Sequence, residues 1–436
     1  MQEIKSQQEI LDKLGIEQLN PMQEQAQEVI NSKSEVVLLS PTGTGKTLAF
    51  LLPLIASLDV NSNQIQLLIV VPTRELAIQI EQVIREMGSG FKANAVYGGQ
   101  NFSKDRVHLQ HLPAILVGTP GRVADHLRRR TFHTRDIKTL VLDEFDKSLE
   151  IGFDSDMQTI VESLPNVKKK ILTSATEGVT IPRFTKLERP YYIDYLDEKN
   201  SQLEIKIVLS PEKDKLQTLV KTLSLLGNEP GIVFCNFKES IERVSDYLTE
   251  IGISHGTFHG GMEQRDRERA LIKFRNGTHQ LLVSTDLAAR GIDIPELTFI
   301  IHYHLPTRAH EFTHRNGRTA RMNSNGTAYV LQWKGEGLPE FVDALETVDL
   351  PDNSPLPDSS EWHTLFISGG RKDKISKGDV AGLFFKQAKL EKEQLGVIEL
   401  KQDCAFVAVK SNDLDGLIQV VSNTKLKKKK VRVSEV

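Results

Sequence analysis

The stretch Val36-Val37-Leu38-Leu39-Ser40-Pro41-Thr42-Gly43-Thr44-Gly45-Lys46-Thr47 decides the fold of the first part of this chain. A short apolar run leads into a glycine-rich turn and a second apolar run begins at Leu48, which indicates a strand, a tight loop and a helix. Glycine lets the loop curl so that its N–H groups converge on phosphate oxygens, Lys46 adds a positive charge, and Thr47 offers a hydroxyl to Mg²⁺. The stretch predicts a nucleotide-phosphate site formed by Thr42, Gly43, Thr44, Gly45, Lys46 and Thr47. The competing interpretation is an ordinary strand–turn–helix with chance glycines, and Ser40 stands where the general pattern has glycine.

The next 140 residues alternate short apolar runs with longer amphipathic stretches. Runs at 67–71, 114–117, 139–142 and 170–173 are too short for helices, so we expect buried strands of a parallel sheet covered on both faces. Polar clusters at 72–74, 118–122, 143–144 and 174–176 directly follow these strands. Because parallel strands end at one edge of a sheet, these clusters are expected to meet beside the phosphate loop.

A second α/β series follows a connector predicted at 190–202. Its strands are expected at 231–234, 257–259, 280–285, 297–303 and 327–331, with a closing helix at 338–348. This half has no phosphate loop with lysine. Residues 350–360 hold three prolines among Asp and Ser and are the best candidate for a linker.

The tail has the order βαββαβ that is typical of RRM domains. We expect strands at 364–368, 396–400, 405–409 and 429–433, and helices at 378–390 and 415–421.

Composition indicates a globular protein that meets a polyanion through its tail. Of 436 residues, 39% are hydrophobic and 26% charged, and neither a membrane span nor a signal-peptide core is found. The two cysteines, Cys235 and Cys404, lack metal-ligand spacing, which favours a reducing cytoplasm. Residues 361–436 contain 15 Lys and Arg against 10 Asp and Glu, a net charge of +5, whereas the rest of the chain carries −8. A solvated lysine edge is the competing interpretation of this basic tail.

Asp143 and Glu144 follow an apolar strand at the edge that carries the phosphate loop. Asp143 can hold the Mg²⁺ that Thr47 also faces, and Glu144 can orient or deprotonate the attacking water. Without the phosphate loop, an exposed acidic turn would be the better interpretation.

From about residue 14 to 329 the sequence resembles the DEAD-box RNA helicases of superfamily two. The resemblance rests on ordered motifs: 15–23 (Q motif), 40–47 (motif I), 72–77 (Ia), 98–99 and 119–122 (RNA-backbone motifs), 143–146 (the family's name motif), 174–176 (III), 232–237 (IV), 259–267 (an RNA contact), 284–293 (V) and 314–321 (VI). It implies two tandem RecA-like parallel-sheet domains, at 1–198 with the Q motif and at 203–349, before the linker 350–360 and the α+β RRM-like domain 361–436.

The resemblance also implies residue roles. ATP would lie between the two halves, with Gln23 reading adenine and Asp293 contacting the nucleotide. Arg318 and Arg321 would act as arginine fingers on the γ-phosphate, although an isolated arginine pair is more often a surface salt-bridge partner. Ser174, Thr176 and His314 would couple phosphate state to domain closure. RNA-backbone contacts would come from Pro72, Thr73, Arg74, Gly99, Thr119, Gly121, Arg122, Gln264, Arg267 and Thr285.

Four residues depart from the family pattern. Phe145 replaces an alanine beside the metal carboxylates, and Ile16 replaces a phenylalanine of the Q motif, with no aromatic residue before it. Asn316 and Ala320 replace Ile and Gly in motif VI. Phosphate binding is therefore predicted more firmly than adenine selectivity.

The tail resembles the RRM-like domain of DbpA-type members of the family, which binds a hairpin of large-subunit ribosomal RNA. Phe366 and Phe406 lie near the aromatic positions of RNA-binding sheets, with core packing as the alternative. Basic residues are better candidates for RNA contact: Arg371, Lys372, Lys374 and the run 427–430, represented by Lys428.

These patterns together predict a cytoplasmic, monomeric, ATP- and Mg²⁺-dependent RNA helicase that acts on ribosomal RNA during assembly of the large subunit. One alternative is an ATP-gated RNA clamp or annealer with weak strand separation, which shares every motif. Another is a translocating DNA helicase or other P-loop ATPase, against which motifs Ia and VI and the tail argue.

Overall fold

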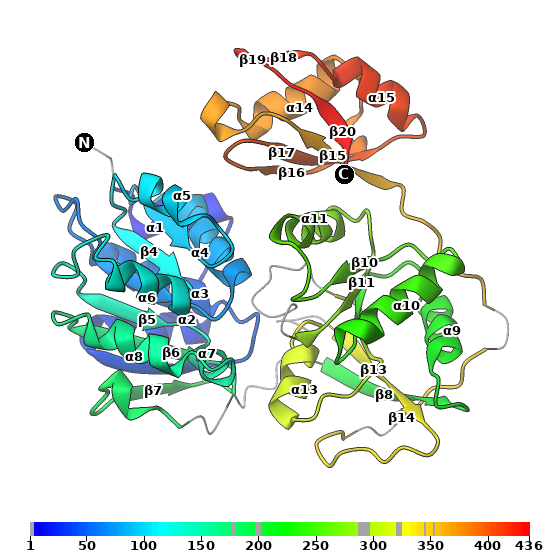
Figure 1. The fold of residues 1–436 in the computed structure, drawn as a ribbon, viewed down its shortest axis with the longest axis horizontal. Coiled ribbons are helices and arrows are strands. Elements are labelled where there is room, and N and C mark those ends of the chain that lie inside the picture. The colour runs from blue at the N-terminus through cyan, green and yellow to red at the C-terminus, as the bar shows by residue number, and fades with distance from the viewer. Residues whose placement is uncertain are drawn as a thin grey trace. The chain divides into compact units, whose positions relative to one another are not determined.

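The structure is a computed structural model that describes residues 4–176, 180–196, 202–286, 297–319, 325–343, 346–351 and 354–436. The described residues before 197 form one compact unit and those from 202 onward form another (Figure 1). In the described part of the chain, no helix is long and apolar enough to cross a membrane.

The first unit is built on a seven-stranded parallel sheet with the order β3-β4-β2-β5-β6-β1-β7. Its strands are β1 (Glu35–Leu39), β2 (Leu67–Val70), β3 (Ala93–Val96), β4 (Ile115–Gly118), β5 (Thr139–Leu142), β6 (Lys169–Ser174) and β7 (Tyr191–Asp194). Its helices are α1 (Gln7–Leu14), α2 (Pro21–Ser32), α3 (Lys46–Ala56), α4 (Arg74–Met87), α5 (Phe102–His108), α6 (Pro120–Arg128), α7 (Phe145–Glu150), α8 (Asp154–Glu162) and η1 (Arg183–Thr185).

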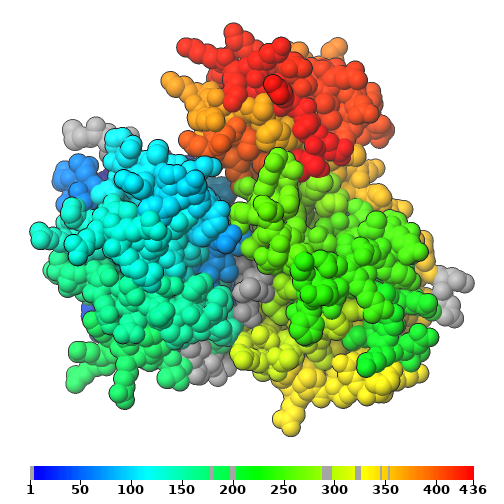
Figure 2. Space-filling view, viewed as in Figure 1, coloured from blue at the N-terminus to red at the C-terminus, as the bar shows by residue number. Residues whose placement is uncertain are grey.

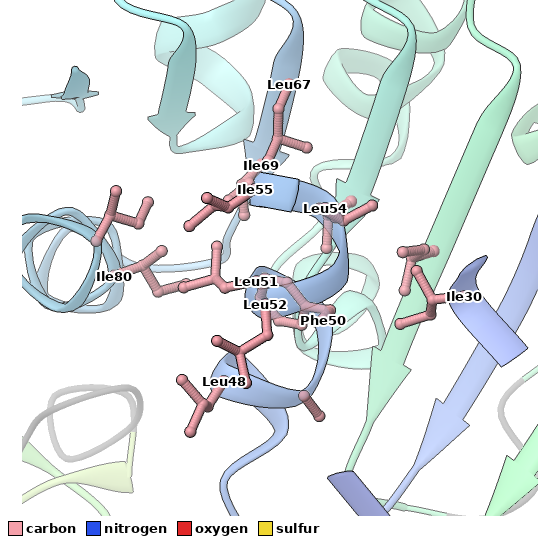
Figure 3. Packing of buried hydrophobic residues seen from close by; sticks show 14 of the residues in the cluster. Ile30, Leu48, Phe50, Leu51, Leu52, Leu54, Ile55, Leu67, Ile69 and Ile80 are labelled. Atoms are coloured by element: carbon pink, nitrogen blue, oxygen red, sulfur yellow. The ribbon is translucent and has the colours of Figure 1, made fainter. Parts of the chain in front are cut away.

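Alternation along the strands buries both faces of this sheet. Val36 and Leu38 of β1 pack with α2, α3 and α4 in one core, whereas Val37 packs with α6 and α8 in the other. Figure 3 shows side chains of α3 such as Phe50 and Leu51 among residues of α2, β2 and α4. These apolar contacts hold β1 and α3 on either side of the glycine-rich loop.

The second unit begins with another parallel sheet, of order β10-β11-β9-β12-β13-β8-β14. Its elements are β8 (Gln202–Ser210), α9 (Leu216–Leu226), β9 (Gly231–Phe234), α10 (Lys238–Glu250), β10 (Gly256–Phe258), α11 (Gln264–Arg275), β11 (Leu281–Ser284), β12 (Phe299–His302), α13 (Ala309–Asn316), β13 (Asn325–Trp333) and β14 (Glu346–Thr347).

The tail forms a four-stranded antiparallel sheet of order β16-β17-β15-β20, with a small β18-β19 hairpin. Its elements are β15 (Trp362–Ile367), η2 (Arg371–Asp373), α14 (Lys377–Lys386), η3 (Lys392–Gln394), β16 (Leu395–Leu400), β17 (Ala405–Lys410), α15 (Leu414–Val421), β18 (Lys425–Leu426), β19 (Lys429–Lys430) and β20 (Val433–Glu435). Leu365, Val407 and Val433 face α14 and α15 in one apolar core. The predicted fold class, two parallel-sheet α/β domains followed by a small α+β domain, is confirmed.

The helix predicted at 338–348 is wrong. Residues 338–343 contain no helix, and Glu346–Thr347 form strand β14 at the edge of β8. The N–H of Val348 donates to the carbonyl oxygen of Ile207 at 2.8 Å, so pairing with a distant strand satisfies the backbone here. The apolar side chain of Val342 still reaches the small core around Phe312.

Several further boundaries differ from the sequence expectation; the tail helix expected at 378–390, for example, ends at Lys386. The connector predicted at 190–202 contains β7, which pairs with β1 and closes the first sheet at its edge. The strand predicted at 429–433 is divided: Lys429–Lys430 pair with β18, and Val433–Glu435 pair with β15. The partners of β7 and β20 are remote in sequence, so the runs themselves carry little signal for these pairings, whereas β18 and β19 form a local hairpin.

Candidate nucleotide and RNA site

The glycine-rich loop joins the end of β1 to the start of α3 in a preorganised turn. Gly43 and Gly45 both have φ of 86°, which favours glycine, and a Cβ on Gly45 would lie 2.4 Å from Gln23 Nε2. The hydroxyl oxygens of Ser40 and Thr44 are 2.7 Å apart, and Thr44 also donates to the carbonyl oxygen of Pro41 at 2.9 Å. Ser40 therefore ties the loop across its mouth, which gives the departure from glycine a structural reason.

Lys46 lies at the first position of α3 and is largely buried. Its Nζ donates to the carbonyl oxygen of Pro41 at 2.6 Å, so the ammonium stays inside the loop. The helix N-terminus and the loop amides add positive potential at the same place. Loop and lysine together make a site for phosphate oxygens.

The Q motif braces this loop from α2. Gln23 and Asn20 form a reciprocal capping box, and Gln23 Nε2 donates to the carbonyl oxygen of Gly45 at 3.3 Å. Asn20 Nδ2 donates to the carbonyl oxygen of Thr44 at 3.0 Å. Sequence reasoning missed Asn20, although its place as N-cap before Pro21 is a recognisable signal.

Asp143 and Glu144 lie at the end of β5, next to β6. Asp143 is 3% exposed and accepts a hydrogen bond from the Thr173 hydroxyl, which in turn accepts from the N–H of Glu144 at 3.0 Å. Glu144 has φ of 47°, an uncommon conformation for a residue with a side chain. Thr173 is thus a positioning residue that the sequence motifs did not include.

The residues present fit Mg²⁺. Burial raises the pKa of Asp143, against the Thr173 hydrogen bond and the Lys46 charge, and a cation would offset that cost of desolvation. Asp143 and Thr47 offer the oxygen ligands that Mg²⁺ prefers, with phosphate oxygens and water to complete the shell. Among the described residues no group of three or more His, Cys, Asp or Glu could hold a metal.

Ser174 and Thr176 connect the phosphate loop to the acidic motif. The N–H of Ser40 donates to the carbonyl oxygen of Ser174 at 3.1 Å, and the Thr176 hydroxyl donates to Asp146 Oδ2 at 3.0 Å. The N–H of Thr176 donates to Ser174 Oγ, also at 3.0 Å. Hydrogen bonds therefore join Ser40 of the loop to Ser174, and join Ser174 through Thr176 to Asp146.

The predicted RNA residues of the first unit gather after β2, β3 and β4. Pro72 and Thr73 follow β2, Thr119 caps α6 and Gly121 lies in its first turn, and Thr73 caps α4 through the N–H of Leu76. Arg74 lies over Gly99, where a Cβ would meet its guanidinium at 2.4 Å.

Arg122 is held by groups that the motifs did not include. Its Nε donates to the carbonyl oxygen of Tyr97 at 3.1 Å and lies 3.2 Å from Asp105 Oδ2. Asp105 is 1% exposed and also contacts the fully buried His126 at 3.3 Å. No sequence pattern around Asp105 indicates that it contacts Arg122 and His126.

In the second unit, Gln264 and Arg267 begin α11, and Thr285 follows β11. The Arg267 guanidinium lies 5.1 Å from the centre of the Phe258 ring, and the N–H of Thr285 donates to the carbonyl oxygen of Phe258. The three predicted contacts therefore meet at the ends of β10 and β11.

Motif VI contains a buried ion pair that sequence reasoning did not single out. Arg315 donates from Nε and Nη2 to both oxygens of Asp286 at 2.5 Å each, and from Nη2 to Asn236 at 2.8 Å. This pair joins motifs IV, V and VI. Arg318 and His314, both largely buried, lie on the segment that Arg315 anchors. Arg321 and Asp293 lie outside the described residues.

The tail residues predicted to bind RNA lie near one another. Arg371 and Lys372 belong to η2, Lys374 follows it, and Lys428 is exposed in the β18–β19 turn. Lys429 Nζ contacts Asp373 Oδ2 at 2.9 Å and links the hairpin to η2.

Family models match the two helicase domains and the tail in the same order along the chain. Family models match DEAD/DEAH box helicase over residues 20–184, helicase conserved C-terminal domain over 214–323 and DbpA RNA binding domain over 364–435. A solved structure of S. cerevisiae Dbp5 bound to RNA and ADP BeF3 has a TM-score of 0.67 and 26% identity, and the match covers 75% of this chain and 87% of that chain.

Fold and motifs thus define a DEAD-box ATP-dependent RNA helicase. The chain is similar to ATP-dependent RNA helicase DbpA of Escherichia coli strain K12, with 33% identity over 97% of this chain and 95% of that protein. DbpA of Bacillus subtilis strain 168 is 29% identical, over 98% of this chain and 96% of that protein. The chain belongs to the DbpA family of DEAD-box helicases.

Proposed function

We propose that this helicase hydrolyses Mg²⁺-bound ATP at the loop Ser40–Thr47 and uses that cycle to open short duplexes of large-subunit ribosomal RNA. The observation that carries the proposal is that β6 holds both parts of the site: Ser174 accepts from the phosphate loop, and Thr173 bonds to Asp143 and Glu144. Ribosome assembly in the cytoplasm is the setting that such a substrate implies.

Each residue has a proposed task. The loop amides, with Thr42, Gly43, Thr44 and Gly45, bind phosphate oxygens, and Lys46 supplies the positive charge. Thr47 and Asp143 hold Mg²⁺, which when bound neutralises the charge that develops on the phosphates. Glu144 orients the attacking water and accepts its proton. Gln23 contacts adenine while it braces Gly45.

The second unit supplies the remaining assignments. Arg318 and Arg321 stabilise the transition-state charge, and Asp293 contacts the nucleotide, as the family resemblance implies. Ser174, Thr176 and His314 relay the phosphate state.

RNA is assigned to the two helicase domains and the tail. The core contacts are Pro72, Thr73, Arg74, Gly99, Thr119, Gly121, Arg122, Gln264, Arg267 and Thr285. Hydroxyls, glycine amides and arginines suit phosphate and sugar rather than bases, so the core binds with little sequence preference. Selection of ribosomal RNA then falls to the tail, through Arg371, Lys372, Lys374 and Lys428.

The proposed domain division is 1–198, 203–349, the linker 350–360 and 361–436. We assign the working form as a monomer. Cys235 and Cys404 are both free thiols, as a reducing compartment requires.

The substitution Lys46→Ala tests the ATP site. It removes the positive charge from the phosphate loop, so RNA-stimulated ATP hydrolysis should fall at least about 100-fold. Release of phosphate is measured with and without RNA, and Lys213→Ala, at an exposed lysine, is the matched control. Turnover retained in Lys46→Ala would overturn the assignment.

A clamp or annealer is the second candidate because it needs the same motifs. Strand displacement on a short labelled RNA duplex separates the two: a helicase releases the strand with ATP, and a clamp hydrolyses ATP without release.

A further inference from the structure

One face of the tail sheet is the surface on which RRM modules ordinarily stack bases. In this chain that face, here called the sheet face, carries Trp362, Thr364, Phe366, Phe406 and Glu399, since directly paired residues of neighbouring strands point to the same side. Phe366 and Phe406 contact each other edge to face with ring centres 5.6 Å apart, and Phe406 is only 5% exposed.

Helix α11 of the second helicase sheet lies against the sheet face. Thr364 Oγ1 is 3.1 Å from Asn276 Nδ2 and 2.7 Å from the Thr278 hydroxyl. A Cβ on Gly277 would lie 3.5 Å from the Trp362 ring, so the turn after α11 packs on the indole. The atoms around α11 (green) and the tail (orange to red) meet in the space-filling view (Figure 2).

A row of alternating charges runs along the same contact. Glu268 Oε1 lies 2.9 Å from Lys401 Nζ, Lys401 pairs with Glu399 at 2.5 Å, and Glu399 is 2.9 Å from Arg275 Nη2. Glu268 and Arg275 are seven residues apart, so they share one side of the helix, about 10 Å apart along its axis. Residues 399 and 401 are two apart and share one side of an extended chain. These two spacings allow the two charges of α11 and the two charges of the tail to alternate in sign along the contact.

These charges are strongly coupled. Burial opposes ionisation of Glu399, yet Lys401 and Arg275 hold the pKa of that carboxyl below its usual value. Burial likewise opposes the charge on Lys401, and Glu399 and Glu268 keep its pKa above the usual value. Removing one member would leave a partly buried charge unpaired, which costs more than the loss of an exposed pair.

Part of the linker lies beside the second helicase domain before the chain reaches the tail. Pro357, Asp358 and Ser360 line a small cavity together with Ile253 and Phe299 of that domain. The end of the linker therefore lies against the second helicase domain just before the tail begins.

We propose that the sheet face is a docking surface for α11 instead of an RNA platform, and that the row Glu268–Lys401–Glu399–Arg275 latches the tail to the second helicase domain. RNA then reaches the tail at its exposed basic residues around η2 and the β18–β19 turn. Because α11 begins with Gln264 and Arg267, the latch sets the place of the tail's RNA relative to the core contact. This last step rests on the proposed function.

Charge swaps that keep the net charge test the latch. The tail swap, Glu399→Lys with Lys401→Glu, keeps the pair within the tail and reverses both pairs to α11. The helix swap, Glu268→Arg with Arg275→Glu, does the same from the other side. Combining all four substitutions restores both interdomain pairs, so it is the matched control for folding and for charge.

Spin labels at Glu250→Cys and Lys386→Cys, both exposed positions, report tail position in a Cys404→Ser background. We expect one narrow distance distribution in the parent, a broad one in each swap, and the narrow one again in the combined variant. Unchanged distributions in both single swaps would overturn the latch, as would a combined variant that stays broad while melting like the parent.

A second readout is strand release from a duplex joined to a ribosomal hairpin. In each swap, strand release from the hairpin-linked duplex should slow about tenfold when compared with release from a duplex that lacks the hairpin. The reason is that a loosely held tail lowers the effective concentration of the helicase core at the linked duplex. Hairpin affinity should stay unchanged, since the basic residues around η2 and the β18–β19 turn, to which RNA is assigned, are untouched. If no variant, the parent included, responds to RNA, the proposed function falls while the distance measurement still decides the latch.

Discussion

Phe145 is a single side chain whose role depends on the direction in which it points. Its place in the acidic motif predicted a bulky ring beside the carboxylates that would hold the metal. The structure turns the ring into the core formed by Leu142, Leu172 and Met157, where it is 2% exposed. The departure from alanine therefore belongs to packing and leaves the carboxylates in place.

The substitution Phe145→Ala should lower the free energy of unfolding by about 3–4 kcal/mol, because it leaves a cavity in a close-packed core. Nucleotide affinity of the folded protein should stay within about threefold, since the ring does not line the loop. Urea unfolding and nucleotide titration measure the two effects. Phe237→Ala, at a residue 64% exposed, is the control and should change stability by less than about 0.5 kcal/mol. Equal losses in both variants would contradict the core placement.

At the scale of the element, β12 ends in a histidine, His302, whose environment limits stability at acid pH, and His304 follows two residues later. His302 is fully buried, stacks on Phe312 with ring centres 4.7 Å apart, and its Nε2 lies 3.0 Å from Asn316 Oδ1. Asn316, a departure in motif VI, is thus the partner of this buried ring. Burial, with the charge of Arg315, lowers the pKa of His302 to about 3, and burial lowers the pKa of His304 to about 4.

Because the folded pKa of His302 lies below the ordinary 6.5, its contribution to stability is present above pH 6.5 and is lost as the pH falls toward 3. At pH 5.5 this one group should lower the free energy of unfolding by about 1 kcal/mol relative to pH 7.5. His302→Gln should flatten the fall in melting temperature between these pH values. His133→Gln, at an exposed histidine, should not. Equal slopes in all three proteins would rule out the buried neutral ring.

At the scale of the whole molecule, charge is divided between parts. The tail from 361 to 436 carries +5 on a chain whose other residues sum to −8. A net negative charge on the rest of the chain disfavours nonspecific adhesion to RNA, and the positive charge of the tail attracts RNA to the tail. This division suits the proposal that the core binds RNA with little sequence preference and the tail selects the RNA.

Reversing exposed charges of the tail, Lys372→Glu with Lys428→Glu, should weaken binding to a ribosomal hairpin and reduce the salt dependence of log K by about one per lost phosphate contact. ATP hydrolysis stimulated by an unrelated duplex should remain. Affinity is measured at several salt concentrations, with Lys386→Glu on α14 as the control. An unchanged hairpin affinity would place RNA elsewhere on the tail.

Local sequence patterns were enough to predict the phosphate loop, the order of the motifs, most strands of the two parallel sheets and the βαββαβ tail. Each of these depends on local patterns: strand and helix periods, glycine at turns, and polar residues directly after strands. For that reason β5 and β9 were predicted to the residue, at 139–142 and 231–234.

Contacts between residues far apart in sequence became clear from the folded chain alone. Thr173 holds Asp143 across 30 residues, β14 pairs with β8 where a helix was expected, and Lys401 pairs with Glu268 across more than a hundred residues. No local period encodes such contacts, because they follow from packing and from the need to satisfy buried polar groups. The same reason applies to Phe406. Its strand could be predicted from the sequence, but the packing of α11 on the sheet face that carries it could not.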